Sequence, residues 1–392
     1  MNKDSKIYIA GHQGLVGSAI WKNFTNKGYT NLLGKHLSEL DLRDQKAVEA
    51  FFNEEKPEYV VLAAAKVGGI MANNTYRADF IYENLQIQNN IIHYAYKSGV
   101  KKLLFLGSTC IYPRDAQQPM SEDCLLTGVL EYTNEPYAIA KIAGLKMCES
   151  YNIQYNTNFI AVMPTNLYGP NDNFDLERSH VLPALLRKIY LGSCLEKGDW
   201  NAIRLDLKKR PIEGVDGESQ DEQIIQILSK YGIKVSTSTN SERIKSQTIT
   251  DRIKSTPLIA GNAITPHNPE KVNVEIWGSG KPMREFLWSE EMADACVYVM
   301  EKVDFKDLSH EGKEQRNCHI NIGTGKEVSI KGLAELIKGI VGFRGELVFN
   351  ADKPDGTMRK LTNPSKLHSL GWHHQIEIEE GIQKLLNWYL NK

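Results

Sequence analysis

The fold is decided by the stretch Lys6-Ile7-Tyr8-Ile9-Ala10-Gly11-His12-Gln13-Gly14-Leu15-Val16-Gly17. Its apolar beginning is typical of a buried strand, and a helical pattern follows from Leu15 to Lys27. At the junction, Gly11 permits a tight turn, Gly14 lets the backbone approach a pyrophosphate, and Gly17 lets helix and strand pack closely. The start of the helix offers free N–H groups and a partial positive charge to phosphates. Because this turn opens an alternating chain, it predicts nucleotide binding rather than an ordinary strand–helix turn.

Short apolar runs and helical patterns alternate through the first half of the chain. We expect strands at residues 6–10, 31–33, 59–63, 102–106 and 159–163, and helices at 15–27, 44–56, 79–98 and 136–151. Alternation of this kind is typical of a parallel sheet with helices on both faces. The predicted fold class is α/β: a Rossmann-type doubly wound parallel sheet with a smaller α/β substrate-binding domain.

The composition is that of an ordinary globular protein and excludes several function classes. The chain has 392 residues, of which 41% are hydrophobic and 24% charged, with a net charge of -1. Such a balance provides no basic field for nucleic acid or an acidic membrane surface, so neither is expected as a partner. No signal-peptide pattern or membrane-spanning apolar run is visible. The six cysteines form no C-x-x-C pair, which favours a cytoplasmic protein with reduced thiols and no metal site.

The end of the second strand indicates which dinucleotide is bound. An acidic residue there would hold the ribose hydroxyls of NAD and repel a 2′-phosphate. The chain instead carries Lys35 and His36, which can pair with the 2′-phosphate of NADP(H), although both are also compatible with an ordinary surface. The prediction is NADP(H).

Two domains follow from this pattern. Residues 1–170 are expected to form an NADP-binding domain to which C-terminal segments return, and residues 171–392 mainly a substrate-binding domain. Within the latter, residues 193–271 are unusually polar, with one helical piece at 220–231. We interpret them as an insertion that forms a small lobe, a lid or a partly ordered loop.

Tyr137 and Lys141 stand four residues apart on the predicted helix 136–151 and therefore share one face. A nearby ammonium is expected to lower the pKa of the tyrosine, which can then exchange a proton with a substrate oxygen. Ser108 ends the fourth strand, where ligands lie in open parallel sheets, and can bond the same oxygen. A second Tyr-x-x-x-Lys copy at Tyr298 and Lys302 lacks this context, and we interpret it as a chance match. The joint pattern resembles the extended short-chain dehydrogenase/reductase superfamily.

Longer stretches narrow the resemblance to the GDP-L-fucose synthase family. The stretches are AAAKVGGI at 63–70, GSTCIYP at 107–113, NEPYAIAK at 134–141, MPTNLYGP at 163–170, SHVLPALLR at 179–187, WGSG at 277–280, MREF at 283–286 and KPDGT at 353–357. That family epimerises C3 and C5 of GDP-4-keto-6-deoxy-D-mannose and reduces its C4 ketone with NADPH. The resemblance implies an NADP-dependent oxidoreductase and isomerase of nucleotide-sugar biosynthesis, with a GDP-linked 4-keto-6-deoxy sugar as substrate and a homodimer as the assembly.

The same resemblance implies roles for further residues. Cys110 corresponds to the base that removes the protons next to the ketone, and His180 to the acid that returns them on the opposite face. Cofactor contacts are implied for Gly11, Gln13, Gly14, Leu15, Val16, Gly17, Lys35, His36, Asp41, Leu42, Ala63, Ala64, Leu106, Gly107, Lys141, Pro164, Asn166, Leu167 and His180. Substrate contacts are implied for Ser108, Asn166, Lys188, Trp277, Arg284 and Asp355.

Two departures from the family pattern keep alternatives open. Gln13 and the pair Lys35 and His36 stand where relatives often carry arginines for the 2′-phosphate. The polar stretch 193–271 falls between His180 and Trp277, where the family builds its sugar site. One alternative is therefore C4 reduction of a GDP-4-keto-6-deoxy-heptose, with or without epimerisation. A second alternative, from another class, is a non-catalytic NADP-binding regulatory protein.

Overall fold

The computed structural model describes residues 1–236, 271–309, 314–353 and 355–392. Its largest sheet has six strands in the order β11-β5-β4-β3-β1-β2, and every neighbouring pair is parallel. These strands are β1 (Ile7–Ala10), β2 (Leu32–Leu33), β3 (Tyr59–Leu62), β4 (Lys102–Leu106), β5 (Phe159–Pro164) and β11 (Ile320–Ile322). The predicted α/β class and its parallel sheet are confirmed.

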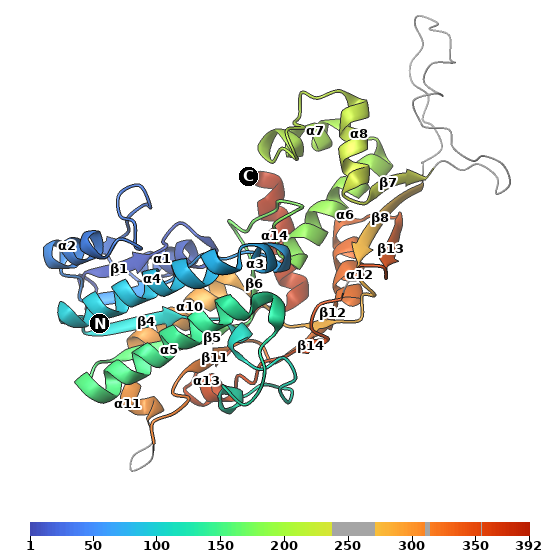
Figure 1. Ribbon diagram of the computed structural model, residues 1–392. Coiled ribbons are helices and arrows are strands. Elements are labelled where there is room, and N and C mark those ends of the chain that lie inside the picture. Colours follow the sequence, from blue (N-terminus) through green and yellow to red (C-terminus); the bar gives the residue numbers. More distant parts are fainter. Residues whose placement is uncertain (237–270, 310–313, 354) are drawn as a thin grey trace, which may run out of the picture.

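Helices cover both faces of this sheet (Figure 1). One core contains alternate strand residues such as Ile9 and Leu104, packed against α1 (Leu15–Asn26), α10 (Ser289–Lys302), α11 (Phe305–Leu308) and α13 (Ser365–Ser369). The intervening residues, such as Tyr8 and Phe105, face the core on the opposite side of the sheet, with α2 (Gln45–Glu55), α4 (Arg77–Lys97) and α5 (Glu135–Tyr155). Side chains alternate across a strand, so the apolar runs are explained by burial on both faces.

The strand order changes direction beside β1, which lies between β2 and β3. In open parallel sheets, ligands bind outside the carboxyl ends of the strands at such a switch point. Gly11 follows β1 and Ala63 follows β3, so both predicted cofactor segments lie at this point. Asp44 caps α2 as expected, since its carboxylate accepts from the backbone N–H groups of Lys46 and Ala47.

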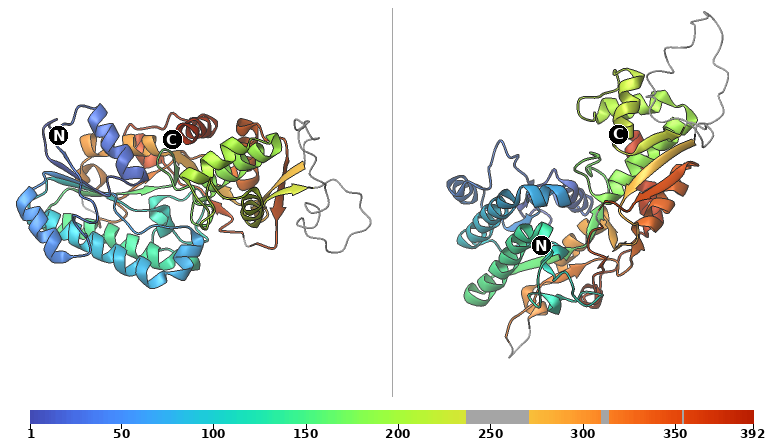
Figure 2. Two further views of the ribbon diagram at one scale, coloured as in Figure 1. Left: turned by 90° about the horizontal axis from the view of Figure 1, so that it is seen from above. Right: turned by 45° about the vertical axis from the view of Figure 1, so that its right-hand side comes forward.

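A second hydrophobic core lies beside the large sheet (Figure 2). Its three-stranded sheet has the order β13-β8-β7, from β7 (Ile233–Ser236), β8 (Lys271–Trp277) and β13 (Glu346–Asn350). The helices of this core are α6 (Val181–Lys197), α7 (Trp200–Lys209), α8 (Asp221–Lys230), α12 (Ile330–Val341) and α14 (Ile378–Asn391).

The polar stretch that was predicted as an insertion from residue 193 does not begin at that residue. Ser193 is 2% exposed inside α6, which continues to Lys197 and ends at Gly198 with a positive φ. The described part, to Ser236, contributes buried residues such as Ile203 and Leu228 to the second core. These residues therefore form part of a packed lobe, and the helix predicted at 220–231 is α8. Residues 237–270 of the predicted insertion lie outside the described residues.

Short strands lie between the large sheet and the second core (Figure 1). β6 (Asn166–Tyr168) pairs with β10 (Phe286–Trp288), and β9 (Met283–Arg284) pairs with both β12 (Val328–Ser329) and β14 (Arg359–Lys360). Among the described residues, the remaining elements are α3 (Ile70–Thr75) and three 3-10 turns, η1 (Thr109–Ile111), η2 (Glu122–Cys124) and η3 (Tyr132–Asn134). Of the predicted site residues after β5, Asn166 and Leu167 lie on β6 and Arg284 lies on β9. His180 and Lys188 belong instead to α6, and Trp277 ends β8.

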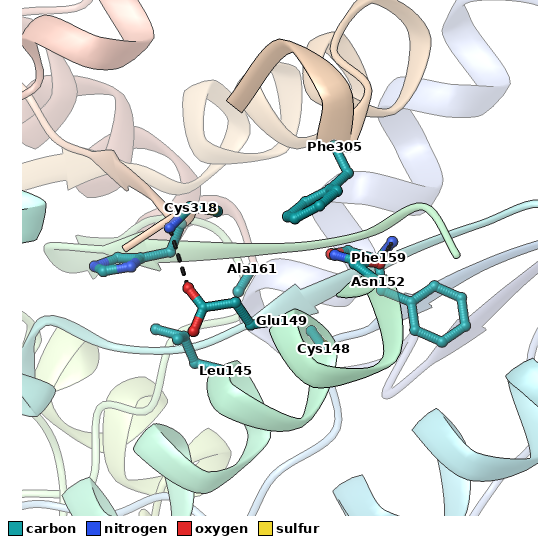
Figure 3. A pocket seen from close by; sticks show the side chains of 9 residues that line it. Leu145, Cys148, Glu149, Asn152, Phe159, Ala161, Phe305 and Cys318 are labelled. Carbon is teal, nitrogen blue, oxygen red and sulfur yellow. Dashed lines mark hydrogen bonds between the residues drawn. The ribbon is translucent and has the colours of Figure 1, made fainter. Parts of the chain in front are cut away.

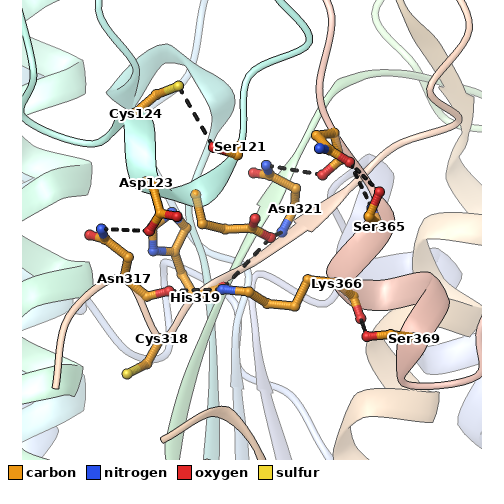
Figure 4. Close-up of polar contacts among 12 residues, drawn as sticks. Ser121, Asp123, Cys124, Asn317, Cys318, His319, Asn321, Ser365, Lys366 and Ser369 are labelled. Carbon is orange, nitrogen blue, oxygen red and sulfur yellow. Dashed lines mark hydrogen bonds and ion pairs between the residues drawn. The ribbon is translucent and has the colours of Figure 1, made fainter. Parts of the chain in front are cut away.

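Buried polar contacts fasten the segment after η1 to β11. Lys366, on α13, donates to the His319 and Asn317 carbonyl oxygens (Figure 4). The Asn321 amide donates to the Met120 carbonyl oxygen. On the same side, the Glu149 carboxylate accepts from the Cys318 N–H, next to a cavity of about 10 Å³ (Figure 3). A cavity of that size holds no more than one water molecule. These contacts stabilise the packing around β11. The one on α5 is made by Glu149, about three helical turns from Tyr137.

Candidate active site

The glycine turn after β1 has the geometry that dinucleotide binding requires. Gly11 has φ +82°, and a Cβ there would lie 2.8 Å from the Ala64 backbone. A Cβ on Gly17 would lie 2.0 Å from the Gly11 carbonyl oxygen, so that position packs helix against turn. Gly14 is the N-cap of α1, is exposed, and would bring a Cβ no closer than 3.5 Å to the Gly11 oxygen. The turn thus presents free N–H groups at a helix start that a phosphate can approach.

Gln13 and His36 meet at the edge of this turn. The Gln13 Nε2 lies 2.7 Å from the His36 Nε2, and Glu39 accepts from the His36 N–H at 2.7 Å. Lys35 lies 3.8 Å from Glu55 in a partly exposed ion pair. The structure therefore brings Gln13 and His36 together, while Lys35 is turned toward α2.

Most of the other predicted cofactor residues lie at or just after the carboxyl ends of strands. Ala63 and Ala64 follow β3, Leu106 ends β4 and Gly107 follows it, and Pro164 ends β5. Asn166 and Leu167 lie on β6, where the Asn166 amide donates to the Glu285 carbonyl oxygen at 2.8 Å. Asp41 is engaged by Arg43 at 2.8 Å, and Leu42 is buried with its carbonyl oxygen bonded to Asn90.

Ser108 and Cys110 are held together by a turn at the carboxyl end of β4. Ser108 is the N-cap of η1, and its Oγ accepts from the Cys110 N–H at 3.4 Å. Cys110 is 5% exposed. Burial raises the pKa of the Cys110 thiol, whereas Lys360, the Ser108 hydrogen bond and Lys141 each act to lower it.

Tyr137 and Lys141 share a face of α5, as predicted. The Lys141 Nζ lies 5.6 Å from the centroid of the Tyr137 ring and donates to the Leu106 carbonyl oxygen at 2.8 Å. Burial lowers the pKa of Lys141 to about 8.

The expected direction of the Tyr137 pKa was wrong. Burial, and then the Cys110 charge, raise it above its usual value, so the hydroxyl remains protonated. The Lys141 ammonium, 5.6 Å from the centroid of the Tyr137 ring, does not outweigh the effect of this burial.

His180 is the N-cap of α6 and solvent-exposed. The protein around its ring nevertheless lowers the pKa of the imidazole by desolvation. A Cβ added to Gly69 would lie 3.7 Å from the Ser179 carbonyl oxygen. The segment after β3 therefore approaches the residue that precedes His180.

Four of the predicted substrate residues lie on α6, β8, β9 and the segment before β14: Lys188, Trp277, Arg284 and Asp355, respectively. The Lys188 Nζ donates to the Glu275 carbonyl oxygen on β8 at 2.5 Å, and burial lowers the Lys188 pKa to about 8. Arg284 is partly buried on β9 and donates to the Thr357 carbonyl oxygen at 2.6 Å. Both cations therefore face main-chain oxygens in a low-exposure setting, where a phosphate can compete for them.

Trp277 and Asp355 belong to the segments that these cations contact: Trp277 ends the strand that Lys188 bonds, and Asp355 stands two residues before Thr357. Trp277 ends β8 and is 60% exposed, with the Lys353 ammonium 5.2 Å above its ring. The Asp355 carboxylate accepts from the Ser279 N–H at 2.8 Å and from its hydroxyl at 2.6 Å. The exposed indole offers a flat face to a base or sugar, while Asp355 fastens the loop beside it.

The sequence did not reveal two residues of this region. Glu285 is fully buried and accepts from the Thr362 N–H at 2.9 Å, the Thr362 hydroxyl at 2.7 Å and the Gly325 N–H at 2.7 Å. Lys360 pairs opposite Arg284 in the short β9–β14 ladder and acts on the Cys110 thiol. Glu285 stands inside the recognised MREF stretch, whereas Lys360 follows the last such stretch and carries no local signal.

The second Tyr-x-x-x-Lys copy lies elsewhere. Tyr298 is on α10, and its hydroxyl donates to the Leu370 carbonyl oxygen at 2.6 Å. This residue links two elements on one face of the large sheet, as expected for a chance match. Within the described residues, no helix is both long enough and apolar enough to cross a membrane.

The fold and this site define a class of protein that the comparisons also identify. The profile of the NAD dependent epimerase/dehydratase family matches residues 7–205 and 249–323, and the chain belongs to that family. GDP-L-fucose synthase 1 of Arabidopsis thaliana is 45% identical over 389 residues, which cover 99% of this chain and 94% of the relative. Within the family, the chain is thus a member of the GDP-L-fucose synthase group.

Two solved structures from Campylobacter jejuni are similar over the whole chain. A GDP-6-OMe-4-keto-L-xylo-heptose reductase is 46% identical with a TM-score of 0.85, covering 100% of this chain and 99% of the other. A GDP-mannoheptose C4 reductase with NADP bound is 45% identical with a TM-score of 0.80, covering 99% of each.

Proposed function

We propose that this protein is an NADPH-dependent epimerase and reductase that converts GDP-4-keto-6-deoxy-D-mannose to GDP-L-fucose. One observation carries the proposal. Ser108, Cys110, Tyr137 and Lys141 occur together at the carboxyl edge of β4, where Ser108 bonds Cys110 and Lys141 bonds the end of that strand. The chain around them is 45% identical to a GDP-L-fucose synthase over 99% of its length.

The residues after β1 fit a dinucleotide. A Cβ on Gly14 would fill the space that a pyrophosphate needs, whereas the N–H groups at the start of α1 are free to bind it. Gln13 and His36 stand beside this turn for the 2′-phosphate, with Lys35 nearby on the same strand end. Bound NADPH supplies the hydride for C4, in keeping with the NADP in the similar heptose reductase.

The second core is proposed to hold the GDP moiety. Lys188 and Arg284 provide positive charge for the diphosphate, which the net charge of the chain does not provide. Trp277 offers its exposed ring to the base or sugar, and Asp355 keeps the 279–281 loop in place. Asn166 lies between this region and the strand ends of the cofactor half.

Epimerisation requires a base and an acid on opposite faces of the sugar. The C4 ketone acidifies the C–H bonds at C3 and C5, and the Cys110 thiolate takes each proton. The electron pair moves to the C4 oxygen, where the Ser108 and Tyr137 hydroxyls donate hydrogen bonds. His180, whose lowered pKa makes its protonated form a ready donor, returns the proton on the other face.

Reduction then requires a proton for the C4 oxygen. Tyr137 is suited to provide it, because its raised pKa keeps the hydroxyl protonated near neutral pH. The Lys141 ammonium stabilises the phenolate that remains after the transfer.

A homodimer is proposed to form through α4 and α5. Tyr82 on α4 and Ile139, Ile153 and Tyr155 on α5 are between 42% and 60% exposed. Exposed apolar side chains on two helices that pack against each other offer a surface for such an interface. A cytoplasmic location is proposed because all six cysteines are free thiols, as a reducing compartment keeps them.

The decisive experiment is turnover of GDP-4-keto-6-deoxy-D-mannose with NADPH in heavy water, followed by NMR. We expect GDP-L-fucose with deuterium at C3 and C5, and label at neither position in the product of Cys110→Ser. Reduction without label in the wild-type product would contradict the epimerase part of the proposal.

A second candidate substrate is a GDP-4-keto-6-deoxy-heptose. The observation in its favour is the 45–46% identity, over almost the whole chain, to two heptose reductases. Competition between hexose and heptose in one reaction mixture measures the ratio of their kcat/KM values directly. Faster turnover of the heptose would replace the fucose assignment, while the site roles would still apply to C4.

A further inference from the structure

Cys110 lies in η1, a short turn whose own backbone hydrogen bonds are long. The Ile111 nitrogen lies 3.3 Å from the Ser108 carbonyl oxygen. The Tyr112 nitrogen lies 3.4 Å from the Thr109 carbonyl oxygen. Hydrogen bonds from N–H to oxygen are most often about 2.9–3.0 Å long, and short 3-10 segments have poorer geometry than an α-helix. The turn therefore needs contacts outside itself if the sulfur is to stay in one place.

Tyr112, the residue that directly follows η1, makes such a contact. Its side chain is buried, and its hydroxyl donates to the Asn321 Oδ1 at 2.5 Å. The same hydroxyl oxygen lies 2.9 Å from the His319 Nε2. Asn321 is on β11, and His319 directly precedes that strand. The chain is thus bonded to the large sheet only two residues after Cys110.

The donor and acceptor of each bond to the Tyr112 hydroxyl follow from the other contacts of its partners. The Asn321 amide nitrogen donates to the Met120 carbonyl oxygen at 3.0 Å, so the Oδ1 faces the hydroxyl and can only accept. Burial lowers the pKa of His319 to about 3, so the ring is neutral and carries one proton. The Nδ1 of this ring has no hydrogen-bond partner among the residues that the structure describes, which assigns the proton to the Nε2. The hydroxyl therefore donates one hydrogen bond and accepts one.

The two partners are themselves held in place. The Asn321 N–H donates to the buried Glu122 carboxylate at 2.9 Å. The His319 carbonyl oxygen accepts from the Lys366 ammonium at 2.9 Å (Figure 4). β11 also pairs in parallel with β5 in the large sheet. Because these bonds do not involve Tyr112, its hydroxyl is bonded to a framework that is ordered without it.

We propose that Tyr112 is a positioning residue, which through Asn321 and His319 holds the Cys110 sulfur where it can take a proton from C3 or C5. In that step the C–H bond breaks, the S–H bond forms, and the electron pair moves to the C4 oxygen. Displacing a reacting group by about 1 Å can lower a rate about 100-fold, so the order of η1 bears directly on this transfer. The inference rests on the proposed function for the role of the sulfur, whereas the order of the turn is independent of any substrate.

The first measurement follows the turn without substrate, by hydrogen–deuterium exchange and mass spectrometry of peptide 107–113. We expect this peptide to exchange about tenfold faster or more in Tyr112→Phe, which keeps the ring and loses both hydrogen bonds. Tyr29→Phe is the matched control, since it removes another buried tyrosine hydroxyl, one bonded to Glu301 at 2.7 Å, and should leave this peptide unchanged. Unchanged exchange in Tyr112→Phe would overturn the proposal.

Variants of His319 provide a second route that keeps Tyr112 intact, should Tyr112→Phe fail to fold. His319→Leu removes the donor to the hydroxyl and should also speed the exchange of peptide 107–113. His319→Gln supplies an amide donor instead of the imidazole and should restore the slower exchange. Equal exchange in the leucine and glutamine variants would contradict the assigned bond.

The second measurement isolates proton transfer from reduction. GDP-4-keto-6-deoxy-D-mannose is mixed with the enzyme and NADP⁺ in heavy water, where no hydride is available, and NMR follows the entry of deuterium at C3 and C5. At saturating substrate, Tyr112→Phe should lower this rate about tenfold or more, with KM changed less than about twofold. Tyr29→Phe should leave both values unchanged.

The possible results separate the proposal from its alternatives. A raised KM with an unchanged rate at saturation would overturn the proposal and make Tyr112 a determinant of substrate binding. Faster peptide exchange with an unchanged rate of deuterium entry would also overturn it, because the order of η1 would not matter for proton transfer. Absence of deuterium from the substrate of the wild-type enzyme would refute the proposed epimerisation itself, while the peptide exchange would still decide whether Tyr112 orders the turn.

Discussion

The two halves of the site are held in place by different means. In the cofactor half, backbone geometry positions the groups: a glycine turn after β1, and the carboxyl ends of strands buried on both faces. In the substrate half, strands β9, β12 and β14 have two residues each, and side chains such as Glu285 and Asp355 hold them. Short strands have few ladder hydrogen bonds, so buried side-chain contacts must supply the missing order. This difference predicts that the two halves respond differently to substitution.

The largest expected effect comes from removing one hydroxyl in the cofactor half. Tyr137→Phe should lower turnover about 1,000-fold with an unchanged thermal midpoint, because the proton donor is lost while the packing remains. Tyr298→Phe, in the second Tyr-x-x-x-Lys copy, is the matched control and should keep full turnover. NADPH oxidation monitored by absorbance measures both. Unchanged turnover in Tyr137→Phe would instead favour the non-catalytic NADP-binding protein.

The next effect concerns stability in the substrate half. Glu285→Ala leaves the Thr362 and Gly325 N–H groups without their buried acceptor and should lower the free energy of unfolding by about 3 kcal/mol. Glu335→Ala, at an exposed position of α12, should change it by less than about 0.5 kcal/mol. Urea denaturation of the two variants measures the difference. Equal stability of the two variants would mean that the short strands are stable without the Glu285 carboxylate. The two halves of the site would then not differ in what holds them in place.

The same contrast explains what the sequence could predict. The strands and helices of the cofactor half, Asp44 as a cap, and the shared face of Tyr137 and Lys141 all follow from local patterns, and the structure confirms them. Lys360 could not be found in this way, because its place opposite Arg284 depends on the pairing of β9 with β14, whose partner residues stand 76 positions apart in the sequence. The direction of the Tyr137 pKa was missed because burial depends on the assembled fold.

A third prediction tests the cofactor half with two glycines of one turn. Gly17→Ala should lower the free energy of unfolding by about 2 kcal/mol, since its Cβ would lie 2.0 Å from the Gly11 carbonyl oxygen. Gly14→Ala should change stability by less than about 1 kcal/mol, because the position has room. It should instead weaken NADPH binding about tenfold, by obstructing the approach of the pyrophosphate. Thermal unfolding without cofactor and calorimetric titration with NADPH distinguish the two, and the reverse pattern would contradict the assigned glycine roles.

The smallest expected effect is a change in pH dependence that originates in the cofactor half. Lys141 has a pKa of about 8, so it is an ammonium below that pH and loses its charge above it. Because the charge stabilises the Tyr137 phenolate, kcat/KM should fall as the pH rises through about 8. In Lys141→Arg the guanidinium stays charged, so whatever activity remains should lack this alkaline limb. Lys302→Arg, in the second copy, should keep the alkaline limb.

If the alkaline limb persists in Lys141→Arg, another group causes it. That group is not His180, because the ordinary pKa of an imidazole already lies below that of the limb, and desolvation lowers the His180 pKa further. The assignment would then pass to Lys188 in the substrate half, whose pKa is also about 8.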